Sequence, residues 1–362
     1  MVKQLRVEIV TVVRDFYRIL LLIFSLAAGS SAWADGQEMH SVKTMPGYQL
    51  HGDQLAVVMN DDDPKSVAVA EYYQKARHIP PQNMVHVVLP VPPHRMTATA
   101  FVQLKRQIEI QLLPHIQAIL LVWTAPYAVE CQSITSALTL GVDPSLCKNT
   151  CAPSKPSPYF NSNATLPFSE MHLRPSMLLP TDSVDLAKAV IDRGVLSGFR
   201  VPAAGAYFLQ TSDTKRNSRS SFFPPPGTVA NKKLTIHRLS QDALDGTQDI
   251  MLYQLGAAHV SKLETLRFLP GALADHLTSF GGDLLESSQM SSLRWLQAGA
   301  TASYGNVSEP CNHWQKFPQS TVLLQHYTAG ASAIEAYWKS VAWPAQGIFI
   351  GEPLAAPYRG RP

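Results

Sequence analysis

The sequence predicts an α/β fold of three layers, a mostly parallel sheet with helices on both faces. Two observations lead to this prediction. Short apolar runs bounded by turn residues alternate with longer segments of helical periodicity, first over residues 51–122 and again from residue 176. The apolar runs lack polar alternation, which is typical of parallel strands covered on both sides. We expect one α/β domain over residues 51–357, interrupted by a Cys- and Pro-rich excursion at 131–172.

The first half of the predicted sheet has three strands and two helices. The strands are expected at Leu55–Asn60, Met84–Leu89 and Ala118–Val122, and the helices at Ser66–Arg77 and Ala100–Leu113. Asp61, Asp62 and Asp63 follow the first strand. They could bind a divalent cation there, but an N-cap for the helix that follows is the simpler interpretation, because successive Asp residues lack the alternating ligands of a calcium loop.

The second half repeats the alternation. Strands are expected at Ser176–Leu179, Ala206–Gln210, Asp249–Leu255, Ala300–Gly305 and Ile348–Ile350. Helices are expected at Val184–Leu196, Met290–Ala298, Ser320–Thr328 and Ser332–Val341. The segment 272–278 is ambiguous between strand and helix. The Gly-rich run 299–305 lacks the Gly-Lys-Ser ending of a phosphate loop, and no cofactor or metal is expected.

Composition excludes several classes of protein. The chain has 362 residues, 30 Lys+Arg against 27 Asp+Glu, and only 16% charged residues. So few charges do not make the basic surface that a nucleic-acid partner requires. The 46% hydrophobic content is enough for a sizeable core.

The N-terminus has the pattern of a secretory signal. A basic segment precedes the apolar run Ile19–Ala28, and Ala32-Trp33-Ala34 supplies the small residues that a signal peptidase needs. A membrane anchor is the alternative, but a span needs about 20 apolar residues. We therefore expect a signal peptide over 1–34, cleavage near Ala34, an N-terminal extension over 35–50, and an exported protein, periplasmic or extracellular, with no membrane span in the mature chain.

Four cysteines follow the predicted signal, an even number that favours two disulfides in an oxidising compartment. Cys131 follows the strand 118–122 and Cys311 follows the strand 300–305. Because parallel strands end at one edge, we expect Cys131–Cys311, which leaves Cys147–Cys151. The other two pairings, a zinc site and a reactive thiol stay open as alternatives.

Several strings resemble an uncharacterised family of exported bacterial proteins, found in genomes with exosortase-type sorting systems. The matching strings include Asn60…Ser66, Trp123-Thr-Ala-Pro126, Thr211-Ser-Asp213, Leu277–Gly282 and Gly351-Glu-Pro-Leu354. Glu352 stands where the family's closing motif usually has Asp. The resemblance implies family membership but no activity.

A more distant resemblance is to gingipain-type cysteine peptidases with a caspase-like fold. Ser176-Met-Leu-Leu-Pro180 and the helix after it resemble the strand-and-helix unit of these enzymes. Their fold implies a His after one parallel strand and a Cys after the next. His259 fills the first position, but Thr278 and Ser279 stand at the second. The resemblance therefore implies that the peptidase dyad is lost or replaced.

The candidate catalytic residues are His259, Ser279, Thr278 and Cys311. The candidate binding residues all follow predicted strands: Asp61, Asp62, Trp123, Thr124, Asp213, Arg216 and Asn217. The basic loop that contains Arg216 and Arg219 could hold a carboxylate or phosphate, although a solvated loop is the simpler interpretation. We expect Asp61, Trp123, His259 and Ser279 to converge only if the sheet brings them to one edge.

Two functions follow from these residues. The first is a non-catalytic binding or assembly protein of the cell envelope on a hydrolase-like scaffold, with an envelope peptide or a glycan as its partner. The alternative is a peptidase-like hydrolase that uses His259 with Ser279 or a Cys. The missing Cys after Thr278 favours the first function.

Overall fold

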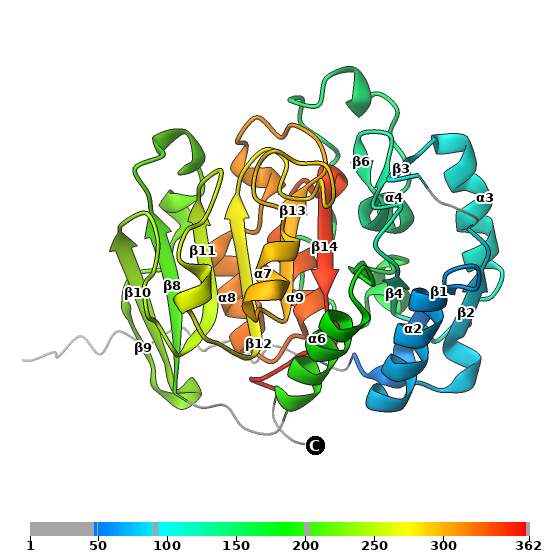
Figure 1. Ribbon diagram of the computed structural model, residues 1–362, viewed down its shortest axis with the longest axis horizontal. Coiled ribbons are helices and arrows are strands. Elements are labelled where there is room, and N and C mark those ends of the chain that lie inside the picture. The colour runs from blue at the N-terminus through cyan, green and yellow to red at the C-terminus, as the bar shows by residue number, and fades with distance from the viewer. Residues whose placement is uncertain (1–46, 49, 90–92, 199–202, 360–362) are drawn as a thin grey trace, which may run out of the picture. The chain divides into compact units, whose positions relative to one another are not determined.

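The computed structural model describes residues 47–359, apart from 49, 90–92 and 199–202 (Figure 1). Its strands are β1 Leu55–Asn60, β2 Met84–Val87, β3 Arg95–Met96, β4 Ala118–Val122, β5 Ala128–Val129, β6 Gln132–Ser133, β7 Ser176–Leu179, β8 Ala204–Gln210, β9 Gly227–Val229, β10 Leu234–Ser240, β11 Ile250–Gly256, β12 Phe268–Leu277, β13 Ala302–Asn306 and β14 Gly347–Gly351. Its α-helices are α2 Pro64–Arg77, α3 Ala98–Glu109, α4 Ile134–Leu140, α5 Pro167–Met171, α6 Val184–Leu196, α7 Leu293–Ala298, α8 Ser320–Thr328 and α9 Ala333–Ser340. The predicted signal peptide lies outside the described residues.

Eleven strands form one sheet in the order β2-β1-β4-β7-β14-β13-β12-β11-β8-β10-β9, and β3, β5 and β6 form a small second sheet. The pairs from β2 to β7 are parallel, as are the pairs from β13 to β10 through β12, β11 and β8. β14 with β7 is also parallel, and the antiparallel pairs of the eleven-stranded sheet are β13 with β14 and β9 with β10. The prediction of a mostly parallel α/β sheet is therefore confirmed.

Helices cover both faces of this sheet. In Figure 1, α6 and α7 lie in front of the sheet and α8 and α9 behind it. Side chains of β8 alternate between two cores: Phe208 joins the larger apolar core, and Tyr207 and Leu209 join a smaller one. No α-helix in the described part of the chain is long and apolar enough to cross a membrane.

The sequence patterns located most of the long elements, left β12 ambiguous, and missed the short elements β3, β5, β6 and α5 together with β9, β10 and α4. β1, β4 and β7 have the predicted bounds, because each is a continuous buried apolar run. β9 and β10 were not predicted, since they lie at the sheet edge with half-exposed residues. α4 was not predicted inside the excursion, because most of its residues are buried and it presents no polar face from which a helical period could be recognised.

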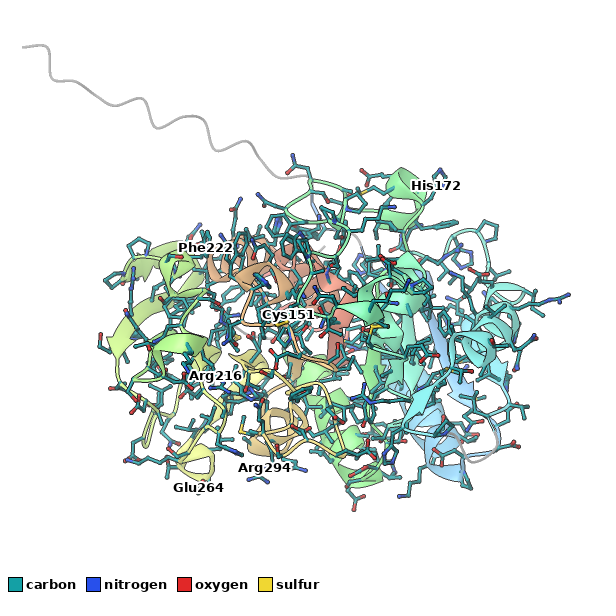
Figure 2. The ribbon with its side chains drawn as sticks, turned by 90° about the horizontal axis from the view of Figure 1, so that it is seen from above. Cys151, His172, Arg216, Phe222, Glu264 and Arg294 are labelled. Carbon is teal, nitrogen blue, oxygen red and sulfur yellow. A yellow bond between two sulfur atoms is a disulfide. The ribbon has the colours of Figure 1, made fainter. Side chains whose placement is uncertain are left out.

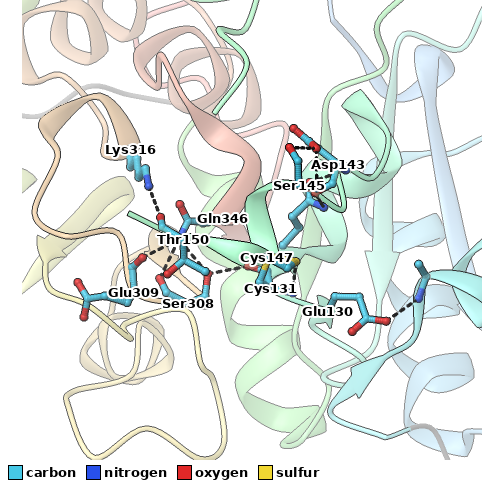
Figure 3. The surroundings of a disulfide bond; sticks show 12 residues. Glu130, Cys131, Asp143, Ser145, Cys147, Thr150, Ser308, Glu309, Lys316 and Gln346 are labelled. Atoms are coloured by element: carbon cyan, nitrogen blue, oxygen red, sulfur yellow. Dashed lines mark hydrogen bonds between the residues drawn. A yellow bond between two sulfur atoms is a disulfide. The ribbon is translucent and has the colours of Figure 1, made fainter. Parts of the chain in front are cut away.

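Both disulfides differ from the expected pairing. The bonds are Cys131–Cys147 and Cys151–Cys311, with Cα separations of 5.4 and 5.2 Å (Figures 2 and 3). Cys147 belongs to a 3₁₀ turn, Leu146–Lys148, and the backbone is extended at Asn149 just after it. The chain therefore moves away from Cys131 before it reaches Cys151. The expectation of Cys131–Cys311 and Cys147–Cys151 was wrong, because this turn sends the two neighbouring cysteines to different partners.

The excursion is also tied to the second half of the chain by buried basic side chains. Lys316 Nζ donates to Thr150 O at 2.5 Å (Figure 3). Lys339 Nζ donates to Ser162 O at 2.8 Å and to Ala164 O at 2.6 Å. Burial lowers the pKa of each of these lysines from 10.5 to about 8. The excursion therefore has anchors that reach it from residues 311, 316 and 339.

Candidate functional site at the carboxyl edge of the sheet

The sheet has two places where ligands of open α/β folds bind. β1 lies between β2 and β4, and β8 lies between β10 and β11. In each case the chain adds the next strand of the sheet on one side of the central strand and a later strand on its other side. Such a switch opens a crevice beyond the carboxyl ends of the two strands. We call them the β1–β4 crevice and the β8–β11 crevice.

The β1–β4 crevice is closed by neutral hydrogen bonds. Ser66, fully buried at the start of α2, donates to Val122 O and accepts from Asn60 N. The Asn60 side chain pairs with the backbone of Leu89 through both its oxygen and its nitrogen. These groups tie the ends of β1, β2 and β4 together.

The three Asp residues after β1 lie at the surface. Asp63 caps α2 by accepting from Lys65 N at 2.9 Å, as the simpler interpretation expected. Asp61 lies 2.9 Å from His86 Nδ1, and Asp62 is exposed. Within the described residues, no group of three or more His, Cys, Asp or Glu side chains is arranged to hold a metal ion.

Trp123 and Thr124 have structural contacts. Trp123 is 1% exposed and its indole donates to Pro126 O at 3.1 Å. Thr124 Oγ1 accepts from the backbone of Thr181 and Asp182, at 2.9 and 2.8 Å. Thr124 thus links the ends of β4 and β7, and both of these candidate binding residues are buried.

The β8–β11 crevice is covered by the loop that follows β8. Thr211 Oγ1 donates to Gly256 O at 2.6 Å, and a Cβ at Gly256 would overlap the Arg216 carbonyl. Glycine is therefore required at the end of β11 for the loop to lie against it. Asn217 supports the same loop, because its amide donates to Thr211 O at 2.7 Å and accepts from Thr211 N at 3.2 Å.

Arg216 extends from this loop toward the end of β12. Its Nη1 lies 2.6 Å from Asp213, and its Nε donates to Thr278 Oγ1 at 3.2 Å. Thr278 in turn donates to Gln289 Oε1 at 2.7 Å. The Thr278 hydroxyl proton is therefore held by an amide rather than by a base. Gln289 was not among the sequence candidates, because nothing in its neighbouring residues marks it.

Beneath this surface pair is a fully buried ion pair. Arg219 Nη1 binds Asp275 Oδ1, and its Nη2 donates to Leu255 O at 2.8 Å. Gln254 donates to the other carboxylate oxygen of Asp275 at 2.8 Å. Burial raises the pKa of Asp275, and the Arg219 charge opposes that rise. Arg219 is thus not in a solvated loop, contrary to the simpler interpretation of the sequence.

His276 is held as a neutral imidazole. Its Nδ1 accepts from the Trp295 indole at 2.9 Å, so its Nε2 carries the proton that Met290 O accepts at 3.1 Å. Burial lowers its pKa to about 3. Both nitrogens are occupied, and His276 is fully buried.

The remaining catalytic candidates do not form a bonded pair. His259 is exposed three residues beyond β11, and Ser279 is 7% exposed two residues beyond β12. No hydrogen bond between described residues joins His259 to Ser279 or Thr278. Cys311 is in a disulfide, so the hypothesis of a reactive thiol at this residue is wrong.

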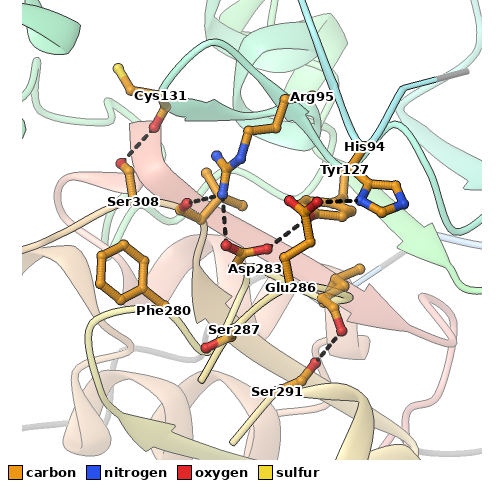
Figure 4. A network of polar contacts seen from close by, with 12 residues as sticks. His94, Arg95, Tyr127, Cys131, Phe280, Asp283, Glu286, Ser287, Ser291 and Ser308 are labelled. Carbon is orange, nitrogen blue, oxygen red and sulfur yellow. Dashed lines mark hydrogen bonds and ion pairs between the residues drawn. The ribbon is translucent and has the colours of Figure 1, made fainter. Parts of the chain in front are cut away.

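A second polar network joins the β12 loop to the first half of the sheet (Figure 4). Asp283 accepts from the Tyr127 hydroxyl at 2.6 Å and lies 3.0 Å from Arg95 Nη2. Glu286 lies 3.0 Å from His94 Nδ1, and Arg95 also donates to Val307 O at 2.7 Å. Loops after β2, β4, β12 and β13 thus meet at one place. Sequence reasoning missed this network, because its members are far apart along the chain.

Comparisons of this chain with known proteins do not identify an activity. No family model matches the chain, and no curated protein matches it, so membership in the exosortase-associated family has no match to support it. One solved structure, a protease, is 10% identical with a TM-score of 0.47, over 87% of this chain and 81% of that chain. Another, the complex of the Porphyromonas gingivalis RgpB pro- and mature domains, is 10% identical with a TM-score of 0.43, over 84% and 79%.

Proposed function

We propose that this protein is an exported, non-catalytic binding protein that holds an envelope peptide at the carboxyl edge of β8, β11 and β12. The state of the Thr278 hydroxyl is the observation that supports it most. A nucleophilic hydroxyl needs a base that takes its proton. Thr278 instead donates to the Gln289 amide and accepts from the Arg216 guanidinium, neither of which is a base at neutral pH.

Arg216 is the group proposed to bind the peptide. Asp213 and Thr278 hold its Nη1 and Nε, while the side chain keeps 20% of its surface exposed. No hydrogen bond from its Nη2 to another described residue is present. A guanidinium held in this way binds a carboxylate with directed, charge-assisted hydrogen bonds. An acidic side chain or a C-terminal carboxylate of a peptide has the matching chemistry.

Export is part of the same proposal. The pattern of residues 1–34 predicts a signal peptide, and residues 35–50 and 51–357 would then form the N-terminal extension and the α/β domain. Two disulfides fit an oxidising compartment. Amino-terminal sequencing of the secreted protein tests this part, with Asp35 expected as the first residue.

A hydrolase is the second candidate, favoured by one observation. His259 and Ser279 follow β11 and β12, which are neighbouring parallel strands. A serine-directed fluorophosphonate probe distinguishes the two functions. We expect no labelling of the mature chain, residues 35–362. Labelling that is lost in Ser279→Ala but kept in the nearby Ser287→Ala would establish the hydrolase instead.

Binding is tested with an array of acidic peptides and the same peptides with Asn and Gln in place of Asp and Glu. We expect the acidic set to bind the mature chain more tightly, and Arg216→Gln to lower that affinity about tenfold. Arg294→Gln is the matched control, since Arg294 is an exposed arginine on α7. Equal binding of both peptide sets would contradict the carboxylate site.

A further inference from the structure

The excursion contains a cavity of about 410 Å³ that is separate from the carboxyl edge described above. This volume is within the usual range for a small-molecule site. Its apolar lining is aliphatic and rich in proline: Leu140, Val142, Pro144, Pro156, Pro158 and Leu173. Such a lining fits an aliphatic group.

The two walls of the cavity are fixed before any ligand arrives. One wall is residues 139–144 and the other is residues 154–158. Between them, Cys147 and Cys151 bond to Cys131 and Cys311. Gln132 adds two hydrogen bonds of 3.2 Å to the Asp143 backbone, and Ser157 N donates to Ala342 O at 2.9 Å. A preformed cavity binds more tightly, because less ordering is needed when the ligand enters.

Opposite charges lie on the two walls. Asp143 lines the first wall, and its Oδ1 accepts from Ser145 N and Oγ at 2.9 and 2.6 Å. These bonds lower the pKa of Asp143, so it is ionised at neutral pH. Lys155 lines the second wall and is exposed. No ion pair between described residues joins Asp143 to Lys155.

One buried polar group in the lining is also unpartnered. Ser154 is 6% exposed, and its hydroxyl has no hydrogen-bond partner among the described residues. A buried hydroxyl without a partner carries a free-energy cost that a bound polar group would remove. Together with the two charges, it gives the cavity three polar groups besides Gln132 and Thr139, whose side chains are already hydrogen-bonded to the protein.

We infer that this cavity binds a zwitterionic aliphatic amino-acid unit, either a free amino acid such as leucine or a short aliphatic peptide. Asp143 binds the ammonium group, Lys155 binds the carboxylate, and the aliphatic lining surrounds the side chain. The inference does not depend on the proposed function at Arg216, because the two sites share no residue.

Isothermal titration calorimetry of the mature chain, residues 35–362, tests this inference with three probes. They are L-leucine, L-leucyl-L-leucine and N-acetyl-L-leucinamide, which keeps the aliphatic side chain without either charge. We expect at least one zwitterion to bind, and the neutral analogue to bind at least about tenfold more weakly. The tighter of the two zwitterions identifies the source of the ligand.

Four variants sharpen the test. Asp143→Asn and Lys155→Gln should each weaken binding about tenfold. Ala345→Phe should abolish it, because Ala345 lines the cavity. Lys148→Gln is the matched control, since Lys148 is exposed in the same excursion and does not line the cavity. Circular dichroism of each variant confirms folding.

Three results would overturn the inference. The first is no heat of binding from either zwitterion at millimolar concentration, and the second is equal affinity for the neutral analogue. The third is an equal loss of affinity for the zwitterion in Lys148→Gln and in Lys155→Gln. Arg216→Gln should leave leucine binding unchanged. The experiment can therefore disprove leucine binding at the cavity without bearing on peptide binding at Arg216.

Discussion

The excursion of residues 131–172 and the loops over β8, β11 and β12 are held in place by different interactions. The excursion is held by two disulfides and by buried side chains of the second half that bind its backbone and Asn161. The β8–β11 crevice is covered by a loop whose own arginines bind the strand ends below. The excursion is held by residues from elsewhere in the chain, whereas the β8 loop is held by its own arginines.

This difference follows from the residues in each region. Apart from the buried helix α4, the excursion has few regular elements and therefore little further apolar surface with which to pack against the sheet. Covalent bonds and cations on backbone carbonyls add to the packing of α4. The β8 loop lies directly on buried strand ends, where one arginine is enough to bind several carbonyls and a carboxylate. Four predictions test the comparison.

The largest effect is expected from the long disulfide. Replacing both Cys151 and Cys311 with Ser opens a link with a sequence separation of 160 residues, whereas Cys131 and Cys147 are 16 residues apart. Chain-entropy estimates predict losses of about 5 and about 3 kcal/mol in the free energy of unfolding. Guanidinium denaturation of this double variant, and of a second one with Ser in place of Cys131 and Cys147, measures the two losses. Equal losses would contradict the long-range anchoring of the excursion.

Arg219→Met should lower the free energy of unfolding by about 3–5 kcal/mol, because it leaves the Asp275 carboxylate buried without its partner. Adding Asp275→Leu should restore part of that loss, since no uncompensated charge then remains. Urea denaturation of the single and double variants measures this. A loss below about 1 kcal/mol in the single variant would show that the loop does not depend on this pair.

Acid should weaken both regions through buried neutral histidines. Burial lowers the pKa of His276 to about 3 and that of His326 to about 4. His326 belongs to the excursion's surroundings, because its Nε2 lies 3.0 Å from Asn161 Oδ1. Unfolding frees each imidazole to take up a proton below pH 6.5. The free energy of unfolding therefore falls as the pH drops from about 6.5 toward 4, by up to about 1.4 kcal/mol per pH unit for each histidine.

Urea denaturation at pH 7, 6 and 5 measures that slope. His276→Gln should reduce the part of this pH dependence that comes from the sheet edge. His326→Gln should reduce the part that comes from the excursion. His237→Gln is the control, because His237 lies on β10, next to the edge strand β9, and is half-buried. Slopes unchanged in both test variants would contradict the assignment of these two histidines as neutral.

The smallest effect is expected at Arg216. Its ion pair with Asp213 is partly exposed, and such pairs contribute about 0–1 kcal/mol. Arg216→Gln should therefore leave the midpoint of denaturation nearly unchanged while it weakens peptide binding. A loss as large as that of Arg219→Met would show that Arg216 is a structural residue.

The sequence by itself determined the α/β class and the positions of the strands that are buried on both sides. Leu55–Asn60 and Ala118–Val122 are continuous apolar runs, and such runs are local properties of the chain. The cap of α2 was equally local, since Asp63 lies directly before it. The end of β12 was not determined in this way, because the segment 272–278 was ambiguous, and the resemblance to gingipain-type peptidases is what placed Thr278 and Ser279 at a strand end.

Only the tertiary structure decided how distant residues combine. Cys151 finds Cys311 across 160 residues, and Arg219 finds Asp275 on a different strand. Each pairing depends on the distance between chain segments in the folded molecule, which no local pattern contains. The chemistry of Thr278 was decided in the same way, because Arg216 and Gln289 come from different loops. Local free-energy preferences therefore determined the strands and helices, and long-range contacts determined the candidate site.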